Sequence, residues 1–311
     1  MRVIEDTIDL SRYLDTPPDA ANVKPASNWC QDVIDRFYSD NPDPGARLPW
    51  GKTHGAIKLR PGEVSIWSGI SGHGKSALLN QVMVSVMAQG EKVCIASLEM
   101  KPAQTMHRMS RQAVGVGSPS VQALRALMRW TDGKLWIYDQ LGTVKRERMM
   151  AVVRYCREEL GITHMVIDSL MKCGIGTDDY NGQKAFVDEL CAHAKDTGMH
   201  IHLVAHSRKS SSEFAEMDKM DIKGASEIAD QVDNIFMLWR NKKKEAEGQK
   251  PHPSKDVVDM PDALLTCSKQ RHGEWEGKVT LWFHKESMQH IADDRGRAMN
   301  MVNLDTTGQT N

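Results

Sequence analysis

The run Gly69-Ile-Ser-Gly-His-Gly-Lys-Ser76 constrains this chain more than any other feature of its sequence. It fits the pattern G-x-x-x-x-G-K-[ST], and it stands between the apolar run Val64–Trp67 and an apolar helical stretch that begins at Ala77. A strand, a glycine-rich turn and a helix in this order place backbone N–H groups and a helix N-terminus around an anion. The pattern therefore predicts a loop that binds the phosphates of a nucleotide.

The residue types in this loop predict separate roles. Lys75 would bridge the phosphates, and the Ser76 hydroxyl would hold magnesium. A glycine-rich turn with a chance lysine is the alternative, and the flanking strand and helix argue against it. The predicted ATP-binding residues are Gly69, Ser71, Gly72, His73, Gly74, Lys75, Ser76 and Ala77.

From Pro61 onward, apolar runs of strand length alternate with helix-compatible stretches. This alternation predicts an α/β fold in which helices cover both faces of a mostly parallel sheet. The last three predicted strands have no long helix between them, so an antiparallel edge is expected there. The predicted strands are 63–67, 92–98, 135–138, 164–168, 200–205, 234–239, 263–267 and 279–283, and the helices are 75–89, 102–112, 121–130, 144–159 and 183–197.

The charges of the chain nearly cancel. Its 40 Lys+Arg residues against 41 Asp+Glu give a formal net charge of −1, which excludes a polybasic nucleic-acid coat. Residues 1–50 hold nine acidic and five basic residues, a net of −4 that leaves +3 for the remainder. The apolar runs are far shorter than the roughly 20 residues of a transmembrane helix, and the start is too acidic for a signal peptide. We therefore expect a cytoplasmic protein without a membrane partner.

The six cysteines are scattered without a Cys-x-x-Cys pair. This spacing predicts neither a zinc site nor a disulfide framework, and most of the thiols are expected to be buried.

Two acidic residues follow predicted strands and could complete a nucleotide site. Asp168 ends the apolar run His164-Met-Val-Ile, where open α/β sheets place their ligands, and would hold the metal. Glu99 follows Val93–Leu98 and would orient the attacking water, provided that this strand neighbours the strand before the phosphate loop. An ordinary strand-ending cap for Asp168 and a solvated glutamate for Glu99 are the competing interpretations.

Four short motifs occur together and in order along the chain. They are Ser97-Leu-Glu-Met100, Asp168 after its strand, His206 after Ile201–Ala205, and Ser268-Lys-Gln-Arg271. The set resembles the RecA-like motor domain of DnaB-type replicative helicases and their relatives, the bacteriophage primase-helicases and Twinkle. The similarity runs from about Leu48 to Phe283. It implies a RecA-like P-loop NTPase fold and ATP and magnesium as ligands.

The resemblance also implies roles for four residues. Glu99 would activate water, and His206 would sense the γ-phosphate. Lys269 and Arg271 would reach the nucleotide of the next subunit, where their charge stabilises the transferred phosphoryl group. Alternate residues of a strand point the same way, so both cations can converge. A finger that acts on a neighbour requires an oligomer, and a hexameric ring is expected. A solvated strand edge is the alternative for the two cations, as is a strand-end histidine for His206.

The predicted DNA contacts lie in the polar segment after His206. Single-strand binding needs cations and hydrogen-bond donors along the phosphate backbone. The same segment contains acidic residues, so a surface loop without a ligand is the alternative. The predicted contacts are Arg208, Lys209, Ser210, Lys219 and Lys223.

Three parts of the chain are expected. Residues 1–50 form an arm with an amphipathic linker helix at Asn28–Asp40, which packs either on a neighbouring subunit or on its own motor. Residues 51–290 form the motor, and 291–311 a disordered tail. The basic run Arg240–Lys255 is expected to be a solvated hairpin tip. Only about 50 residues precede the motor, which implies no primase domain on this chain. It implies instead a separate primase in a phage or mobile-element replisome, inside a bacterial or phage-infected cell.

Three functions fit these observations. A ring-forming, ATP-dependent replicative helicase that translocates on single-stranded DNA is the first. A RecA- or RadA-like recombination ATPase that forms filaments is the second, and a nucleotide-gated loader or adaptor is the third.

Overall fold

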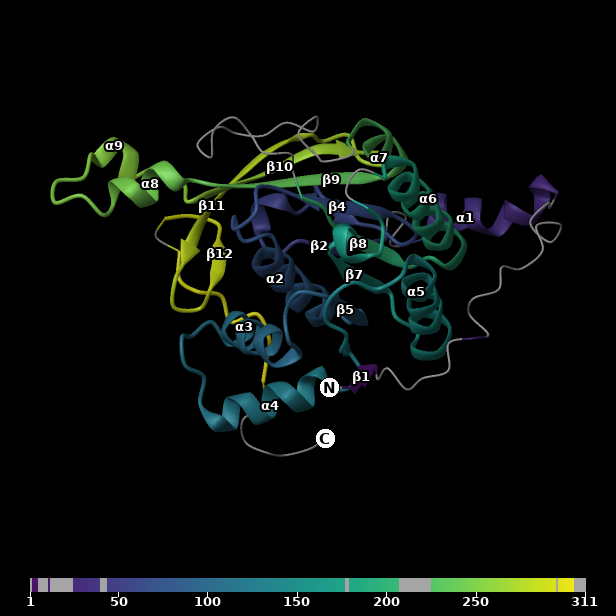
Figure 1. The fold of residues 1–311 in the computed structure, drawn as a ribbon, viewed down its shortest axis with the longest axis horizontal. Coiled ribbons are helices and arrows are strands. Elements are labelled where there is room, and N and C mark those ends of the chain that lie inside the picture. Colours follow the sequence, from purple (N-terminus) through teal and green to yellow (C-terminus); the bar gives the residue numbers. More distant parts are fainter. Residues whose placement is uncertain are drawn as a thin grey trace.

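The computed structural model describes residues 2–4, 11, 25–39, 44–176, 179–206, 225–294 and 296–304. Within this part of the chain one large sheet has the strand order β1-β6-β5-β7-β8-β4-β9-β10-β11-β12 (Figure 1). A second, small sheet pairs β2 (Ala46–Arg47) with β3 (Lys58–Leu59). The strands of the large sheet are β1 (Arg2–Ile4), β4 (Val64–Ser68), β5 (Val93–Ser97), β6 (Leu135–Tyr138), β7 (His164–Asp168), β8 (His200–Val204), β9 (Asn234–Arg240), β10 (Ala263–Gln270), β11 (Gly277–His284) and β12 (Gln289–Ile291).

Seven strands of the large sheet run parallel, from β1 to β9 in spatial order. The strands β10, β11 and β12 then add to β9 in antiparallel pairs. The predicted antiparallel edge is therefore confirmed for β10 and β11, whereas β9 belongs to the parallel part. The short strands β1, β2, β3 and β12 were not predicted, because two or three residues are too few for a periodic pattern.

Helices cover both faces of the sheet, as the alternation predicted. The helices α5, α6 and α7 pack on one face, and α2, α3 and α4 on the other (Figure 1). The α-helices are α1 (Cys30–Tyr38), α2 (Lys75–Ala88), α3 (Pro102–Val114), α4 (Val121–Thr131), α5 (Arg146–Leu160), α6 (Tyr180–Thr197), α7 (Ala225–Gln231), α8 (Lys242–Glu247) and α9 (Lys255–Val258). Short 3-10 helices span η3 (Ala26–Trp29), η4 (Gly51–Thr53) and η5 (Leu170–Lys172).

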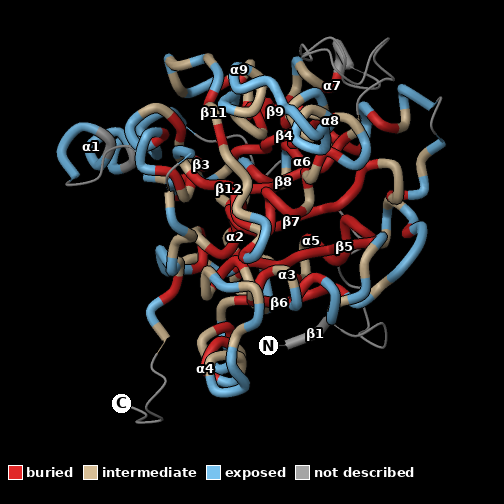
Figure 2. Tube along the Cα trace, turned by 90° about the vertical axis from the view of Figure 1, so that its left-hand side faces the viewer, coloured by how far each residue is buried: buried red, intermediate tan, exposed pale blue. Residues whose placement is uncertain are grey.

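The central strands lie in the core with helices on both sides. Every residue of β4, β5, β7 and β8 is buried (Figure 2). A parallel strand that is covered on both faces has no solvent side, which explains why these strands are almost continuous apolar runs. Five of the cysteines are buried as expected, and only Cys30 is exposed.

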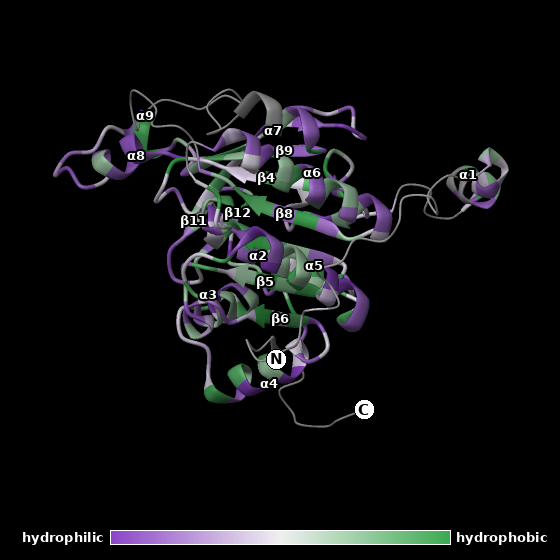
Figure 3. Ribbon diagram, turned by 45° about the vertical axis from the view of Figure 1, so that its right-hand side comes forward, coloured by the Kyte–Doolittle hydropathy of each residue, from purple (hydrophilic) through white to green (hydrophobic). Residues whose placement is uncertain are grey.

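The amphipathic helix predicted at Asn28–Asp40 is confirmed as η3 followed by α1, and it stands away from the sheet and its helices (Figure 3). Every residue of 25–39 whose side chain is described is exposed, with Phe37 at 77% and Tyr38 at 83%. Packing on its own motor, one of the two expected arrangements, is therefore not the arrangement seen here.

The expectation of a disordered tail from residue 291 is wrong for residues 291–294 and 296–304. Val302 is buried, and Met299 and Met301 pack against the core beside α2 and α3. The Met301 N–H donates to the Ala113 carbonyl at 3.0 Å, and the Met299 N–H donates to Gln289 Oε1 at 2.7 Å. This segment packs on the helices of the sheet domain, and its few apolar residues form no periodic pattern that would predict this packing.

The run Arg240–Lys255 connects the antiparallel neighbours β9 and β10, so the predicted hairpin is confirmed. It is not an open loop, however, because α8 and α9 form at its tip (Figure 1). Asn241 caps α8 by accepting a hydrogen bond from the Lys244 N–H at 3.0 Å.

Candidate functional site

The loop Gly69–Gly74 lies at the carboxyl end of β4 and leads into the N-terminus of α2. A Cβ atom at Gly69 would stand 2.4 Å from the Leu238 carbonyl oxygen, so the loop passes too close to β9 for any side chain there. Gly72 and Gly74 have φ of 81° and 89° with open space around the missing Cβ, so their backbone conformation is what requires glycine. The predicted loop is confirmed in shape, and its backbone N–H groups and helix N-terminus are typical of anion sites.

Lys75 is buried in the loop that it follows. Its ammonium donates hydrogen bonds to the carbonyls of Gly69 at 2.7 Å and Ile70 at 3.1 Å. Burial lowers the pKa of Lys75, and the nearby carboxylates Asp168 and Glu99 act against this shift. The Lys75 ammonium is therefore hydrogen-bonded to neutral carbonyl groups of the loop. An anionic phosphate bound in the loop would form a stronger, charge-assisted hydrogen bond with it.

Ser76 and Asp168 meet at the base of the loop, as predicted. The Ser76 hydroxyl donates to Asp168 Oδ2 at 2.5 Å. Burial raises the pKa of Asp168 and Glu99 raises it further, while the Ser76 hydrogen bond and Lys75 lower it. Magnesium prefers oxygen ligands and takes one or two from a protein when phosphates supply others. The two oxygen donors fit that ion, which would supply charge stabilisation to the phosphates.

Glu99 lies near these groups by a different route from the one expected. Its strand β5 is separated from β4 by β7 and β8, so the condition attached to the Glu99 role, that β5 neighbours β4, is not met. However, β5 pairs with β7 so that Ser97 stands opposite Asp168, and the Leu98 N–H donates to the Asp168 carbonyl at 3.0 Å. The carboxylate of Glu99 consequently influences the pKa of both Lys75 and Asp168.

His206 follows β8, the strand between β7 and β4, and is partly buried. It therefore reaches the same carboxyl edge of the sheet as the phosphate loop, Asp168 and Glu99. These residues come from four strands, and the sheet brings them together.

Lys269 and Arg271 lie at the other end of the strands, where the parallel strands β4 and β9 begin. The backbone of Arg271 is level with Asp233, which is hydrogen-bonded to Val64 at the start of β4, whereas the phosphate loop follows the end of β4. Five strand residues separate the two levels, about 16 Å at the usual rise. The two cations do converge, because Lys269 Nζ and Arg271 Nη2 both donate to the Asp230 carbonyl, at 3.0 and 2.8 Å.

Arg240 is a residue beside the loop that the sequence did not single out. It ends β9, its N–H donates to His73 Nδ1 at 3.1 Å, and its Nη1 donates to the Gly72 carbonyl at 3.5 Å. Arg240 also pairs with Glu245 of α8. The sequence does show that Arg240 ends an apolar strand, a position where ligand-binding residues are common. Only the pairing of β4 with β9 shows that this strand adjoins the phosphate loop.

The five predicted DNA contacts, Arg208, Lys209, Ser210, Lys219 and Lys223, lie outside the described residues. Among the residues that are described, no helix has both the length and the apolar character needed to cross a bilayer.

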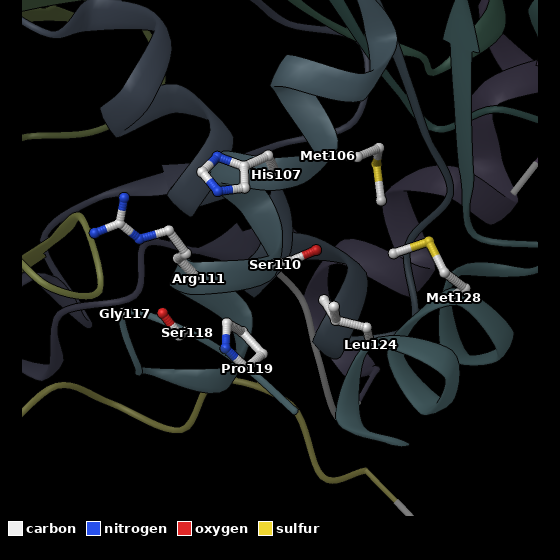
Figure 4. A pocket seen from close by; sticks show the side chains of 9 residues that line it. All are labelled: Met106, His107, Ser110, Arg111, Gly117, Ser118, Pro119, Leu124 and Met128. Atoms are coloured by element: carbon white, nitrogen blue, oxygen red, sulfur yellow. The ribbon is translucent and has the colours of Figure 1, made fainter. Parts of the chain in front are cut away.

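A cavity of about 410 Å³ lies between α3 and α4 (Figure 4), and none of its lining residues belongs to the phosphate loop. Met106, Leu124 and Met128 form one part of its wall, and His107, Ser110 and Arg111 another. The sequence did not predict this cavity, because the packing of two helices decides it.

The loop, the buried acidic strand end and the sheet order together define an α/β P-loop NTPase fold. The chain belongs to the AAA domain family, whose match covers residues 53–212, just over half of its length.

Two solved structures share the fold. One is described as a DnaB-like replicative helicase and its interactions with primase; the likeness has a TM-score of 0.68 at 14% identity and covers 87% of this chain and 69% of that one. The other is described as an ATPase domain, with a TM-score of 0.64 at 16% identity over 89% of this chain and 99% of that one. The chain thus has the fold of DnaB-type helicase motor domains.

Proposed function

We propose that this chain is the ATP-hydrolysing motor of a ring-shaped replicative DNA helicase. In this proposal Lys75 binds the phosphates, Ser76 and Asp168 hold magnesium, Glu99 orients the attacking water and His206 senses the γ-phosphate. All five stand at one edge of the sheet, where a nucleotide on the loop Gly69–Gly74 would meet them. Arg240 is an added candidate for nucleotide contact because it adjoins the loop.

One observation carries the proposal: Lys269 and Arg271 lie at the opposite end of the strands from Lys75, Asp168 and the phosphate loop. Arg271 lies about 16 Å along the strands from its own phosphate loop and cannot reach a nucleotide bound there. A neighbouring copy could receive it, so the separation supports a site shared between subunits. A hexamer is the proposed assembly, and the motor spans residues 51–304 after an arm of about 50 residues.

Two surfaces support assembly between copies. The apolar side chains of α1 have no cover among the described residues of this chain, with Phe37 and Tyr38 more than three-quarters exposed. The cavity between α3 and α4 offers apolar walls at Met106, Leu124 and Met128. We propose that α1 of one copy packs over the α3–α4 surface of the next.

The proposed partners are single-stranded DNA, bound by the segment that holds Arg208, Lys209, Ser210, Lys219 and Lys223, and a separate primase. The support for primase is a likeness of fold, since one of the similar structures is described together with primase.

Forked-duplex unwinding tests the proposal directly. Wild-type protein with ATP and magnesium should separate a duplex with single-stranded tails, whereas Lys75→Ala should not, since it removes the phosphate-binding cation. Electron microscopy on single-stranded DNA should show closed rings. Open filaments would instead indicate a recombination ATPase, and slow hydrolysis that DNA does not stimulate would indicate a loader or adaptor.

Complementation between two inactive variants tests the shared site. Glu99→Gln copies keep the finger but cannot activate water, and Arg271→Ala copies keep the nucleotide site but lack the finger. Mixing them should restore part of the ATPase activity through interfaces that join an intact site to an intact finger. A mixture as inactive as its components would refute the action of Arg271 on a neighbour.

A further inference from the structure

The two finger cations are held by one helix end in their own chain. Lys269 Nζ donates to the carbonyls of Ala229 at 2.7 Å and Asp230 at 3.0 Å. Arg271 Nη2 donates to the carbonyls of Asp230 at 2.8 Å and Gln231 at 3.0 Å. These carbonyls belong to the last turn of α7, whose negative dipole end favours cations.

Asp233 adds a buried carboxylate to these contacts. It is 1% exposed, and its Oδ1 lies 3.2 Å from Arg271 Nη1 in an ion pair. Its Oδ2 accepts a hydrogen bond from the Val64 N–H at 2.9 Å, and its own carbonyl accepts one from the Arg271 N–H at 2.8 Å. Asp233 thus joins the first residue of the phosphate-loop strand to both the backbone and the guanidinium of Arg271.

The geometry leaves the guanidinium fixed but accessible. Asp233 Oδ1 is buried and accepts no hydrogen bond among the described residues. A buried carboxylate needs a charged partner, and the ion pair with the Arg271 guanidinium supplies one. The Arg271 side chain is 34% exposed, so its other side can meet a ligand from outside the chain. Catalysis by a distant cation depends on its position, because a displacement of about 1 Å can cost about 100-fold in rate.

We propose that Asp233 and the last turn of α7 form a cradle that positions Arg271 and Lys269 for hydrolysis on a neighbouring copy, with Asp233 as a positioning residue. The inference rests on the proposed function, since it requires Arg271 to act between subunits. It adds to that function a residue that lies at the start of β4, at the opposite end of the strand from the phosphate loop of its own chain.

Asp233→Asn separates the two duties of the side chain. The amide oxygen can still accept the hydrogen bond from the Val64 N–H, while the amide NH₂ replaces the negative oxygen that faces Arg271. The fold keeps its local hydrogen bond, and the guanidinium loses its ionic partner. Glu63→Gln is the matched control, because Glu63 is also a buried carboxylate in this region but pairs with Asn234 and Arg60.

The complementation mixture shows in which copy Asp233 matters. Asp233→Asn is introduced either into the Glu99→Gln copies, which donate the finger, or into the Arg271→Ala copies, which receive it. In the donor, the restored kcat should fall about 10- to 100-fold with KM for ATP unchanged, because only the position of the cation is altered. In the receiver, the restored kcat should remain unchanged. Glu63→Gln in the donor should leave kcat at the level of the unmodified mixture.

Three outcomes are distinguishable in this design. If the unmodified mixture shows no restored activity, the shared site itself fails and the cradle fails with it. If the mixture works but Asp233→Asn in the donor has no effect, the cradle alone is refuted. Equal losses in donor and receiver would mean a general structural role, which also overturns the inference.

Discussion

Glycines of the phosphate loop are required for two different reasons. Gly69 lies against the backbone of β9, where a Cβ would stand 2.4 Å from the Leu238 carbonyl oxygen. Gly72 has open space around it and is constrained only by its φ of 81°. A steric conflict with backbone cannot relax by moving a side chain, whereas an unfavourable φ costs a limited energy.

Gly72→Ala should therefore cost about 1–2 kcal/mol of folding stability, and Gly69→Ala should cost more because β4 and β9 must separate. Urea unfolding of the two variants would measure the difference, and ATP binding would show whether the loop keeps its shape. Equal stability of the two variants would contradict the close contact with Leu238.

Glu99→Gln keeps the size of the side chain and removes its charge. We expect ATP binding to persist and hydrolysis to fall at least about 100-fold, as for loss of a general base. Rapid-quench measurement of hydrolysis beside nucleotide binding would test this. Full activity in Glu99→Gln would mean that another group orients the water.

The starts of the central strands carry a buried network of histidines. The Trp67 indole N–H donates to His202 Nδ1 at 3.1 Å, and His202 Nε2 lies 3.1 Å from His164 Nδ1. His200 Nε2 lies 2.8 Å from the Ser65 hydroxyl. Because Trp67 can only donate, His202 must carry its proton on Nε2, which it then donates to His164. This network works only with neutral rings.

The three histidines of this network and two further buried histidines, His193 and His290, predict that the fold is less stable in acid. Burial, the first cause in each case, lowers the pKa of five histidines: His193, His200 and His290 to about 4, and His164 and His202 well below the ordinary value. The unfolded chain therefore binds more protons than the folded chain between about pH 6.5 and 4. The contribution of these histidines to the free energy of unfolding is fully present above pH 6.5. It falls as the pH decreases, by up to about 1.4 kcal/mol per pH unit for each histidine.

Urea unfolding at pH 7.5 and at pH 5.0 should show this loss. The raised pKa values of Glu63 and Asp168 act in the opposite direction, but two carboxylates oppose five histidines. His193→Gln should reduce the pH dependence by about one proton. Equal stability at the two pH values would contradict neutral burial of the histidines.

At the scale of the whole molecule, the apolar side chains of α1 are exposed and no described residue of the same chain covers them. An apolar helix side in water is typical of a surface that binds a partner. Since Phe37 is 77% exposed in the single chain, its replacement removes little packing from the fold.

Phe37→Asp should therefore lower assembly and ATPase activity without lowering the melting temperature of the monomer. Sedimentation velocity with ATP and magnesium would measure the assembly. Met260→Asp is the matched control. Met260 is an apolar residue, 47% exposed, in the connection between β9 and β10, and its variant should assemble normally. Normal assembly of Phe37→Asp would remove α1 from the proposed interface.

Most of the site was predictable because parallel strands end at one edge. Each of Lys75, Asp168, Glu99 and His206 follows an apolar strand, and that position alone places it near the phosphate loop. Strand order was not predictable, because many orders satisfy the same pattern of apolar runs. Glu99 lies near the phosphate loop although two strands separate β5 from β4, because β5 pairs with β7, the strand that ends at Asp168.

The amino-acid sequence by itself determined the phosphate loop, the α/β class and the positions of the long elements, because each depends on local residue types and on periodic burial. Only the tertiary structure decided what lies at the other end of the strands. The cradle of Asp233 and α7 around Lys269 and Arg271 and the packed segment 296–304 join residues far apart in the chain. The cavity between α3 and α4 depends on how two neighbouring helices pack. Such contacts depend on strand order and helix packing, which no local pattern specifies.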